Sequence, residues 1–203
     1  DTVEGDTIDD LIFGQDGDDT IDGNDGDDTI TGGAGDDTID GGADNDIAIF
    51  AGNQADYTFE SSADGLTVTI TDTVNNDVDT VTGVETLRFD DGDITVSHDT
   101  SLNQLVLTGD TTGDDITIVG TVPVTVVGAD GDDDIVGGSG NDIIYGSAGD
   151  DMLRGNAGDD IAIFAGNQAD YTFESSTDGL TITITDTVNN DVDTVTGVET
   201  LRF

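Results

Sequence analysis

The sequence has no cysteine, lysine or tryptophan, and it contains one proline, one methionine and one histidine, His98. Without cysteine there can be no disulfide, no thiolate zinc site and no cysteine nucleophile. A single histidine also argues against a histidine-dependent catalytic triad and against a multi-histidine metal site. His98 stands beside Asp99 in a polar stretch, where we predict an exposed loop residue.

Basic residues are almost absent as well. The 203 residues include 47 acidic and 3 basic side chains, which gives a formal net charge of −44. A polyanion of this kind repels nucleic acid and anionic lipid, because both are bound through basic patches. No apolar run approaches the ~20 residues that span a bilayer. We therefore expect neither nucleic-acid binding nor membrane insertion.

The acidic residues that are present are mostly aspartate, with 42 Asp and 5 Glu. Aspartate is common in turns and in calcium-binding loops, whereas glutamate favours helices. So high a net charge is typical of disordered chains. Yet 33% of the residues are hydrophobic, and the strand formers Thr, Ile and Val are abundant. A partner that neutralises carboxylates would allow such a chain to fold.

Glycine and aspartate recur with a period of nine residues in two blocks, as in GQDGDDTID (14–22) and GGSGNDIIY (137–145). Position eight is usually a large aliphatic residue. The aspartates at position six are Asp10, Asp19, Asp28, Asp37, Asp46, Asp133, Asp142, Asp151 and Asp160. The glycines at positions one and four of the regular repeats are Gly14, Gly17, Gly23, Gly26, Gly32, Gly35, Gly128, Gly131, Gly137, Gly140, Gly146, Gly149, Gly155 and Gly158.

A second, longer repeat is superimposed on the nonamers. Residues 47–89 recur at 161–203 with 41 of 43 positions identical, at an offset of 114 residues. The chain is thus one unit of 114 residues followed by 89 residues of another. We expect it to be part of a longer tandem array.

Each nonamer predicts a turn followed by a three-residue strand. The segment G-x-x-G-x-D suits a turn with positive φ at its glycines. In the strand, the middle side chain points away from its two neighbours, so parallel stacking buries the position-eight aliphatic residues. Two nonamers complete one coil. The position-six aspartates of alternate repeats then lie one strand spacing, ~4.8 Å, apart.

Stacked aspartates destabilise such a coil in the absence of metal. Two charges at this separation repel by roughly 3–4 kcal/mol at an effective dielectric of 20. One buried aliphatic side chain per nonamer contributes only about 1.5–3 kcal/mol. Calcium reverses the sign of the interaction, because it takes about 6–8 oxygen ligands. We therefore expect metal binding to supply much of the folding free energy.

The nonamers resemble the RTX family, the hemolysin-type calcium-binding repeats of Gram-negative exoproteins, which form a parallel β-roll. The resemblance implies that position-six aspartates of repeats n and n+2 bridge calcium, with about five ions in all. The implied pairs are Asp10/Asp28, Asp19/Asp37, Asp28/Asp46, Asp133/Asp151 and Asp142/Asp160. The extra acids at position five are interpreted as solvated turn residues.

Outside the nonamers the period changes, and alternating residues such as those of 66–71 predict half-buried strands. The predicted fold is all-β, with two parallel β-rolls, each followed by an antiparallel β cap, arranged as a tandem elongated rod. The predicted segments are a first roll (1–49), a first cap (50–98), a connector with lead-in strands (99–127), a second roll (128–163) and a second cap, shorter at its end (164–203).

The predicted function is a non-catalytic, calcium-binding structural module of a secreted or cell-surface protein. The resemblance implies type I secretion of the unfolded chain, followed by folding in extracellular calcium. One alternative is a calcium-dependent, adhesin-like module that binds a glycan or a cell surface. Another is an accessory domain of a secreted calcium-dependent enzyme whose catalytic residues lie outside this sequence.

Overall fold

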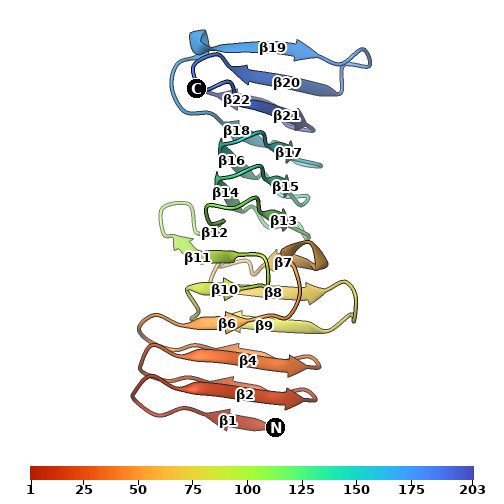
Figure 1. Ribbon diagram of the computed structural model, residues 1–203. Helices are drawn as coiled ribbons and strands as arrows, with labels where there is room; N and C mark the ends of the chain where they lie inside the picture. The colour runs from red at the N-terminus through yellow and green to blue at the C-terminus, as the bar shows by residue number, and fades with distance from the viewer. The chain divides into compact units, whose positions relative to one another are not determined.

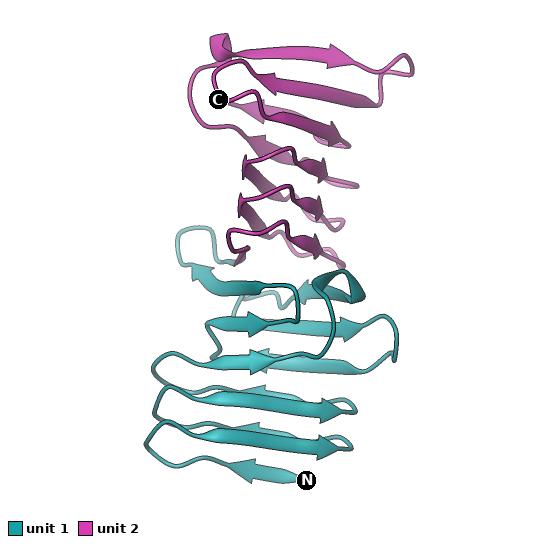
Figure 2. Ribbon diagram, viewed as in Figure 1, with its two compact units in different colours: residues 1–105 teal, residues 106–203 magenta.

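The computed structural model describes residues 1–203, almost entirely as short β-strands and turns (Figure 1). The chain divides into two compact units, residues 1–105 and 106–203 (Figure 2). The two helical elements are single 3-10 turns, η1 (Gln54–Asp56) and η2 (Gln168–Asp170). No helix has the length and apolar character that a membrane span requires.

Unit 1 contains two facing sets of strands joined by the nonamer turns. One set, in spatial order, comprises β1 (Thr2–Glu4), β3 (Thr20–Asp22), β5 (Thr38–Asp40), β9 (Val78–Thr82), β8 (Thr67–Asp72) and β7 (Tyr57–Ser61). The other comprises β2 (Leu11–Asp16), β4 (Thr29–Ala34), β6 (Ile47–Ile49), β10 (Thr86–Arg88) and β11 (Asp93–Asp99).

The strand register of unit 1 follows an 18-residue period. β3 pairs in parallel with β5, which places Ile21 beside Ile39, and β2 pairs with β4, which places Ile12 beside Ile30. These position-eight side chains are buried and form the core between the two sets of strands. The period confirms that two nonamers complete one coil.

The segment that follows the first block combines hairpins with a further coil. β7, β8 and β9 are antiparallel neighbours. β9 also pairs in parallel with β5, so that Val81 lies beside Ile39, and β10 pairs in parallel with β6, so that Leu87 lies beside Ala48. Residues 78–88 therefore continue the roll within the segment predicted as the first cap.

Unit 2 repeats this plan. One set comprises β13 (Asp115–Thr117), β15 (Asp134–Val136), β17 (Met152–Arg154), β21 (Val192–Thr196), β20 (Thr181–Asp186) and β19 (Tyr171–Ser175). The other comprises β14 (Thr125–Asp130), β16 (Ile143–Ala148), β18 (Ile161–Ile163) and β22 (Thr200–Arg202). β14 also pairs with residues 106–108 of β12 (Gln104–Thr108), which belong to unit 2. Parallel coils followed by antiparallel hairpins in both units confirm the predicted fold class.

Two predictions need comment. His98 lies within β11 and is partly buried, so the prediction of an exposed loop residue is wrong. The predicted connector contains β13, which pairs in parallel with β15 and places Ile116 beside Ile135. The division into five segments stays a prediction, because the structure itself separates only the two units.

Candidate metal centre

The side chains of the position-six aspartates lie on the inside of the nonamer turns. Eight of the nine predicted aspartates have an exposed fraction of 3% or less. Asp10, in the first coil, is partly exposed. Burying so many carboxylates in one narrow fold requires that each oxygen find a partner.

In seven of the nine aspartates, one carboxylate oxygen accepts a backbone N–H from the neighbouring coil, and these bonds form a ladder. The backbone N–H of Asp19 donates to Oδ1 of Asp37 over 2.8 Å, and that of Asp28 donates to Oδ1 of Asp46 over 2.8 Å. The same contact joins Asp10 to Asp28 (2.7 Å), Asp133 to Asp151 (3.0 Å) and Asp142 to Asp160 (2.8 Å). The structure thus makes neighbours of all five predicted pairs.

The second carboxylate oxygen is buried without a hydrogen-bond partner in most of these turns. The residues with an unpartnered Oδ2 are Asp19, Asp28, Asp37, Asp46, Asp133, Asp151 and Asp160. An unsatisfied buried acceptor costs about 1–3 kcal/mol, and more when the group is charged. These oxygens are the strongest sign in the structure that the turns hold a ligand.

The same seven turns share one backbone conformation, which we call the open turn. The residues at positions two and four both have positive φ, even where they are not glycine, as at Gln15, Asn24, Asp44 and Ala129. A left-handed conformation costs an ordinary residue roughly 1–2 kcal/mol. Such strain persists only where the surrounding structure imposes it, and it is concentrated at functional sites.

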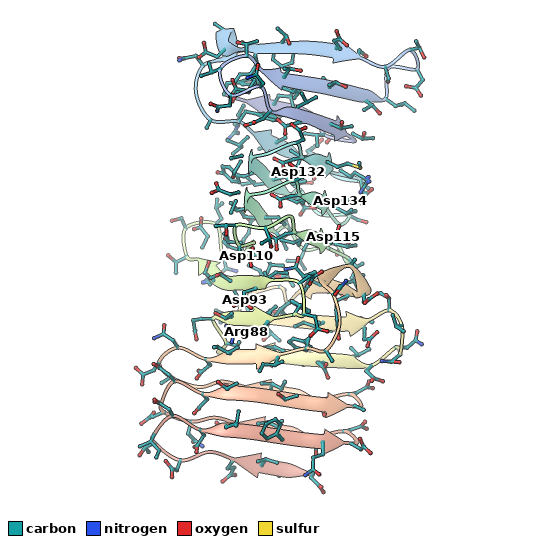
Figure 3. The ribbon with its side chains drawn as sticks, in the orientation of Figure 1. Arg88, Asp93, Asp110, Asp115, Asp132 and Asp134 are labelled. Atoms are coloured by element: carbon teal, nitrogen blue, oxygen red, sulfur yellow. The ribbon has the colours of Figure 1, made fainter.

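Three other turns satisfy the second oxygen from their own backbone, and we call these closed turns. Neither position two nor position four has positive φ in them. The residue at position two donates its N–H to the Oδ2 of position six: Asp6 to Asp10 (2.8 Å), Asp110 to Asp114 (3.0 Å; Asp110 is labelled in Figure 3) and Gly138 to Asp142 (3.0 Å). The sequence pattern does not separate the two kinds, because residues 137–145 match it fully.

The neighbouring coil explains the closed turn at Asp142. The stretch before Gly128 lacks an aspartate at position six and has Val124 there instead. The N–H of Val124 donates to Oδ1 of Asp142 over 3.0 Å. A Cβ on Gly140 would lie 2.8 Å from backbone atoms of Val122 and Pro123. The turn therefore packs on a proline-containing coil that has no carboxylate to stack with.

Sequence reasoning missed five acidic residues that extend the ladders. Asp114 stands at the start of one, since its N–H donates to Oδ1 of Asp133 over 2.9 Å. The others accept the N–H of the last aspartate in each row: Asp79 from Asp37 (2.9 Å), Glu85 from Asp46 (3.0 Å), Asp193 from Asp151 (3.1 Å) and Glu199 from Asp160 (2.8 Å). Their signal in the sequence is an acid two residues before an aliphatic residue, as in Asp79-Thr80-Val81.

Burial and mutual repulsion raise the pKa of these carboxyl groups. Burial is the largest cause in each case, and it raises the pKa of Asp46 to about 6 and those of Asp79, Asp133 and Asp193 to about 7. Neighbouring carboxylates add to the shift, for example Asp151 for the pKa of Asp133. Without a cation, the coil edges therefore oppose ionisation of their own aspartates.

The donor atoms around the unpartnered oxygens suit a hard cation. Nowhere do three or more carboxylate or imidazole side chains converge on one point. The oxygens lie against backbone instead: a Cβ on Gly14 would fall 2.6 Å from Oδ2 of Asp19 and would also collide with the carbonyl oxygen of Gly32. Carboxylate and carbonyl oxygens are the ligands that calcium takes in proteins. The residues present therefore fit calcium.

The position-five acids, predicted to be solvated, are exposed but form a second ladder. Oδ1 of Asp18 accepts the N–H of Asp36 over 3.1 Å, and Oδ1 of Asp132 accepts that of Asp150 over 3.0 Å. The amide oxygen of Asn141 makes the same contact to Asp159. Because an amide can replace the carboxylate, this ladder does not depend on charge.

Comparison with known proteins supports the assignment of the repeats. The RTX calcium-binding nonapeptide repeat matches four times, over residues 1–30, 13–48, 22–57 and 127–162, which together make up just under half of the chain. No curated protein matches the sequence significantly. Among solved structures, the extracellular lipase LipA from Serratia marcescens is 22% identical, with a TM-score of 0.43. That alignment covers 98% of this chain and 38% of the lipase chain. Residues 1–57 and 127–162 therefore match RTX calcium-binding nonapeptide repeats.

Proposed function

We propose that this chain is a calcium-driven folding module of a secreted or cell-surface protein. Calcium ions join neighbouring coils through the unpartnered aspartate oxygens and convert an unfolded polyanion into the β-roll. The buried, unpartnered Oδ2 atoms of the seven open turns carry this proposal. No hydrogen bond within the chain satisfies these atoms, and their charges repel one another along each coil edge.

The five predicted pairs fall into two groups according to whether both of their aspartates lie in open turns. Both aspartates stand in open turns in Asp19/Asp37, Asp28/Asp46 and Asp133/Asp151. The remaining pairs, Asp10/Asp28 and Asp142/Asp160, each include an aspartate whose second oxygen is already satisfied. We propose that the first three pairs bind calcium and that the other two stay free of metal.

The proposed location follows from the calcium dependence of folding. Sites in extracellular modules have dissociation constants of about 10⁻⁴–10⁻³ M, so they fill in extracellular fluid and stay empty in the cytosol. A chain that folds only outside the cell stays unfolded during export. In this proposal the module is structural and carries out no reaction itself.

A calcium titration followed by far-UV circular dichroism tests the proposal. The chain is first freed of metal with a chelator, and magnesium serves as the control because it demands a rigid octahedral site and loses its water reluctantly. We expect a cooperative gain of β signal with calcium and none with magnesium. A chain that is already β-folded in chelator would overturn the folding-module proposal.

A further inference from the structure

A turn of three residues replaces the nonamer turn where the roll passes from β9 to β10 (Figure 1). Residues 23–28 link β3 to β4, and residues 41–46 link β5 to β6, so a nonamer turn has six residues. Only residues 83–85, with the sequence Gly-Val-Glu, lie between β9 and β10. Residues 197–199 have the same sequence and lie between β21 and β22. We call these two segments the short turns.

Each short turn stacks on the last nonamer turn of its block as another nonamer turn would. The N–H of Gly41 donates to the carbonyl oxygen of Thr82 over 2.9 Å, and that of Gly155 donates to the carbonyl oxygen of Thr196 over 3.0 Å. Gly23 makes the same contact to β5 one coil earlier. The short turns therefore occupy the place of a further nonamer turn, although their sequence does not match the repeat.

Within the regular coils, an unpartnered aspartate oxygen lies close to a carbonyl oxygen of the next coil. A Cβ on Gly23 would collide with both Oδ2 of Asp28 and the carbonyl oxygen of Gly41. The two oxygens therefore approach a common point between the coils. A carboxylate oxygen and a carbonyl oxygen that approach one point are part of the ligand set that calcium takes in proteins.

The last aspartate of each block faces a carbonyl oxygen of the short turn in the same way. A Cβ on Gly41 would lie 2.7 Å from Oδ2 of Asp46 and would collide with the carbonyl oxygen of Gly83. Asp46 is 1% exposed, and its Oδ2 has no hydrogen-bond partner. The equivalent residues in unit 2 are Gly155, Asp160 and Gly197, and Oδ2 of the fully buried Asp160 is likewise unpartnered.

The nonamer pairs do not account for the unpartnered oxygen of Asp160. Its partner in the predicted pair, Asp142, stands in a closed turn. The other neighbour of Asp160 in the ladder is Glu199, at the end of the short turn. A carbonyl oxygen in this place is not general to the end of a row, because the three atoms nearest to a Cβ on Gly32 would all belong to Asp37.

We infer that each short turn completes a calcium site with the last aspartate of its block, outside the nonamer repeats. In unit 1 the ion binds Oδ2 of Asp46, the carbonyl oxygen of Gly83 and the carboxylate of Glu85, whose Oε2 accepts the N–H of Asp46 over 3.0 Å. The ligands in unit 2 are Asp160, Gly197 and Glu199. The inference rests on the proposed function and adds that calcium fastens each cap to the nonamer coils that precede it.

Equilibrium dialysis with metal analysis tests the inference at the calcium concentration that just saturates the unchanged chain. Glu85→Gln keeps an acceptor for the N–H of Asp46 but removes a charged ligand, so we expect about one calcium ion fewer per chain. Glu85→Gln combined with Glu199→Gln should remove about two. The control combines Glu60→Gln with Glu174→Gln, which are exposed residues of the two caps. It lowers the charge equally and should leave the bound calcium unchanged.

A crystal structure of the unchanged chain grown in calcium gives a second test that needs no substitution. It should show an ion about 2.3–2.6 Å from both Oδ2 of Asp46 and the carbonyl oxygen of Gly83. Circular dichroism in calcium checks that each dialysed variant keeps its β fold. Ions at the nonamer pairs with none at the short turns, or a full calcium count in the folded double variant, would overturn this inference alone. An unchanged chain that binds no calcium would overturn the proposed function as well.

Discussion

At the scale of single residues, two aspartates of the same repeat position face different surroundings. Oδ2 of Asp151 is buried without a partner, whereas Oδ2 of Asp142 accepts the N–H of Gly138. Asp151→Asn removes a charged ligand from an open turn and should lower the calcium bound at saturation by about one ion per chain. Asp142→Asn should leave the bound calcium unchanged. Equilibrium dialysis with metal analysis measures both.

The matched pair separates the role of the turn from that of the residue type. Both substitutions replace the same side chain in repeats of the same unit, and in both the Oδ1 of that side chain accepts a backbone N–H over 3.0 Å. A loss of calcium from both variants would mean that the sequence pattern alone decides metal binding. If neither variant lost calcium, the ions would have to bind at other residues.

At the scale of elements, the coils that the period defines could be predicted and the coil made by β9 and β10 could not. A nine-residue period is enough to predict β3, β5 and their stacking, because each turn and strand recurs in phase. The hairpins of β7 and β8 intervene before the next coil, so Asp79 and Glu85 fall out of phase with the nonamers. The nonamer pattern alone does not separate open from closed turns, because the turn at Asp142 depends on the neighbouring coil, which has Val124 in place of an aspartate.

The continuity of the roll through β10 leads to a stability prediction. Leu87 is fully buried beside Ala48, so Leu87→Ala should lower the unfolding free energy in saturating calcium by about 2–5 kcal/mol. Leu66 is 56% exposed, and Leu66→Ala should change it by less than about 0.5 kcal/mol. Urea unfolding measures both values. An equal loss of unfolding free energy in the two variants would contradict a core that extends into the first cap.

At the scale of the whole molecule, the buried carboxylates make the calcium-free fold sensitive to pH. The pKa of Asp46 in the fold is about 6, and those of Asp79, Asp133 and Asp193 are about 7, against ~3.9 for an unfolded aspartate. Between these values the folded chain binds more protons than the unfolded chain. Its stability therefore falls as pH rises from about 4 to 7. In chelator, lowering the pH from about 7.5 to about 5 should increase the β signal in circular dichroism.

Calcium should reverse this dependence on pH. Protons and calcium compete for the same carboxylate oxygens, and a ligand must be deprotonated before it binds metal. The calcium concentration at the folding midpoint should therefore rise as the pH falls, while the chelated chain gains structure over the same interval. Titrations at several pH values measure the midpoint directly. A midpoint that does not change between pH 7.5 and 5 would show that the buried aspartates are not the groups that calcium neutralises.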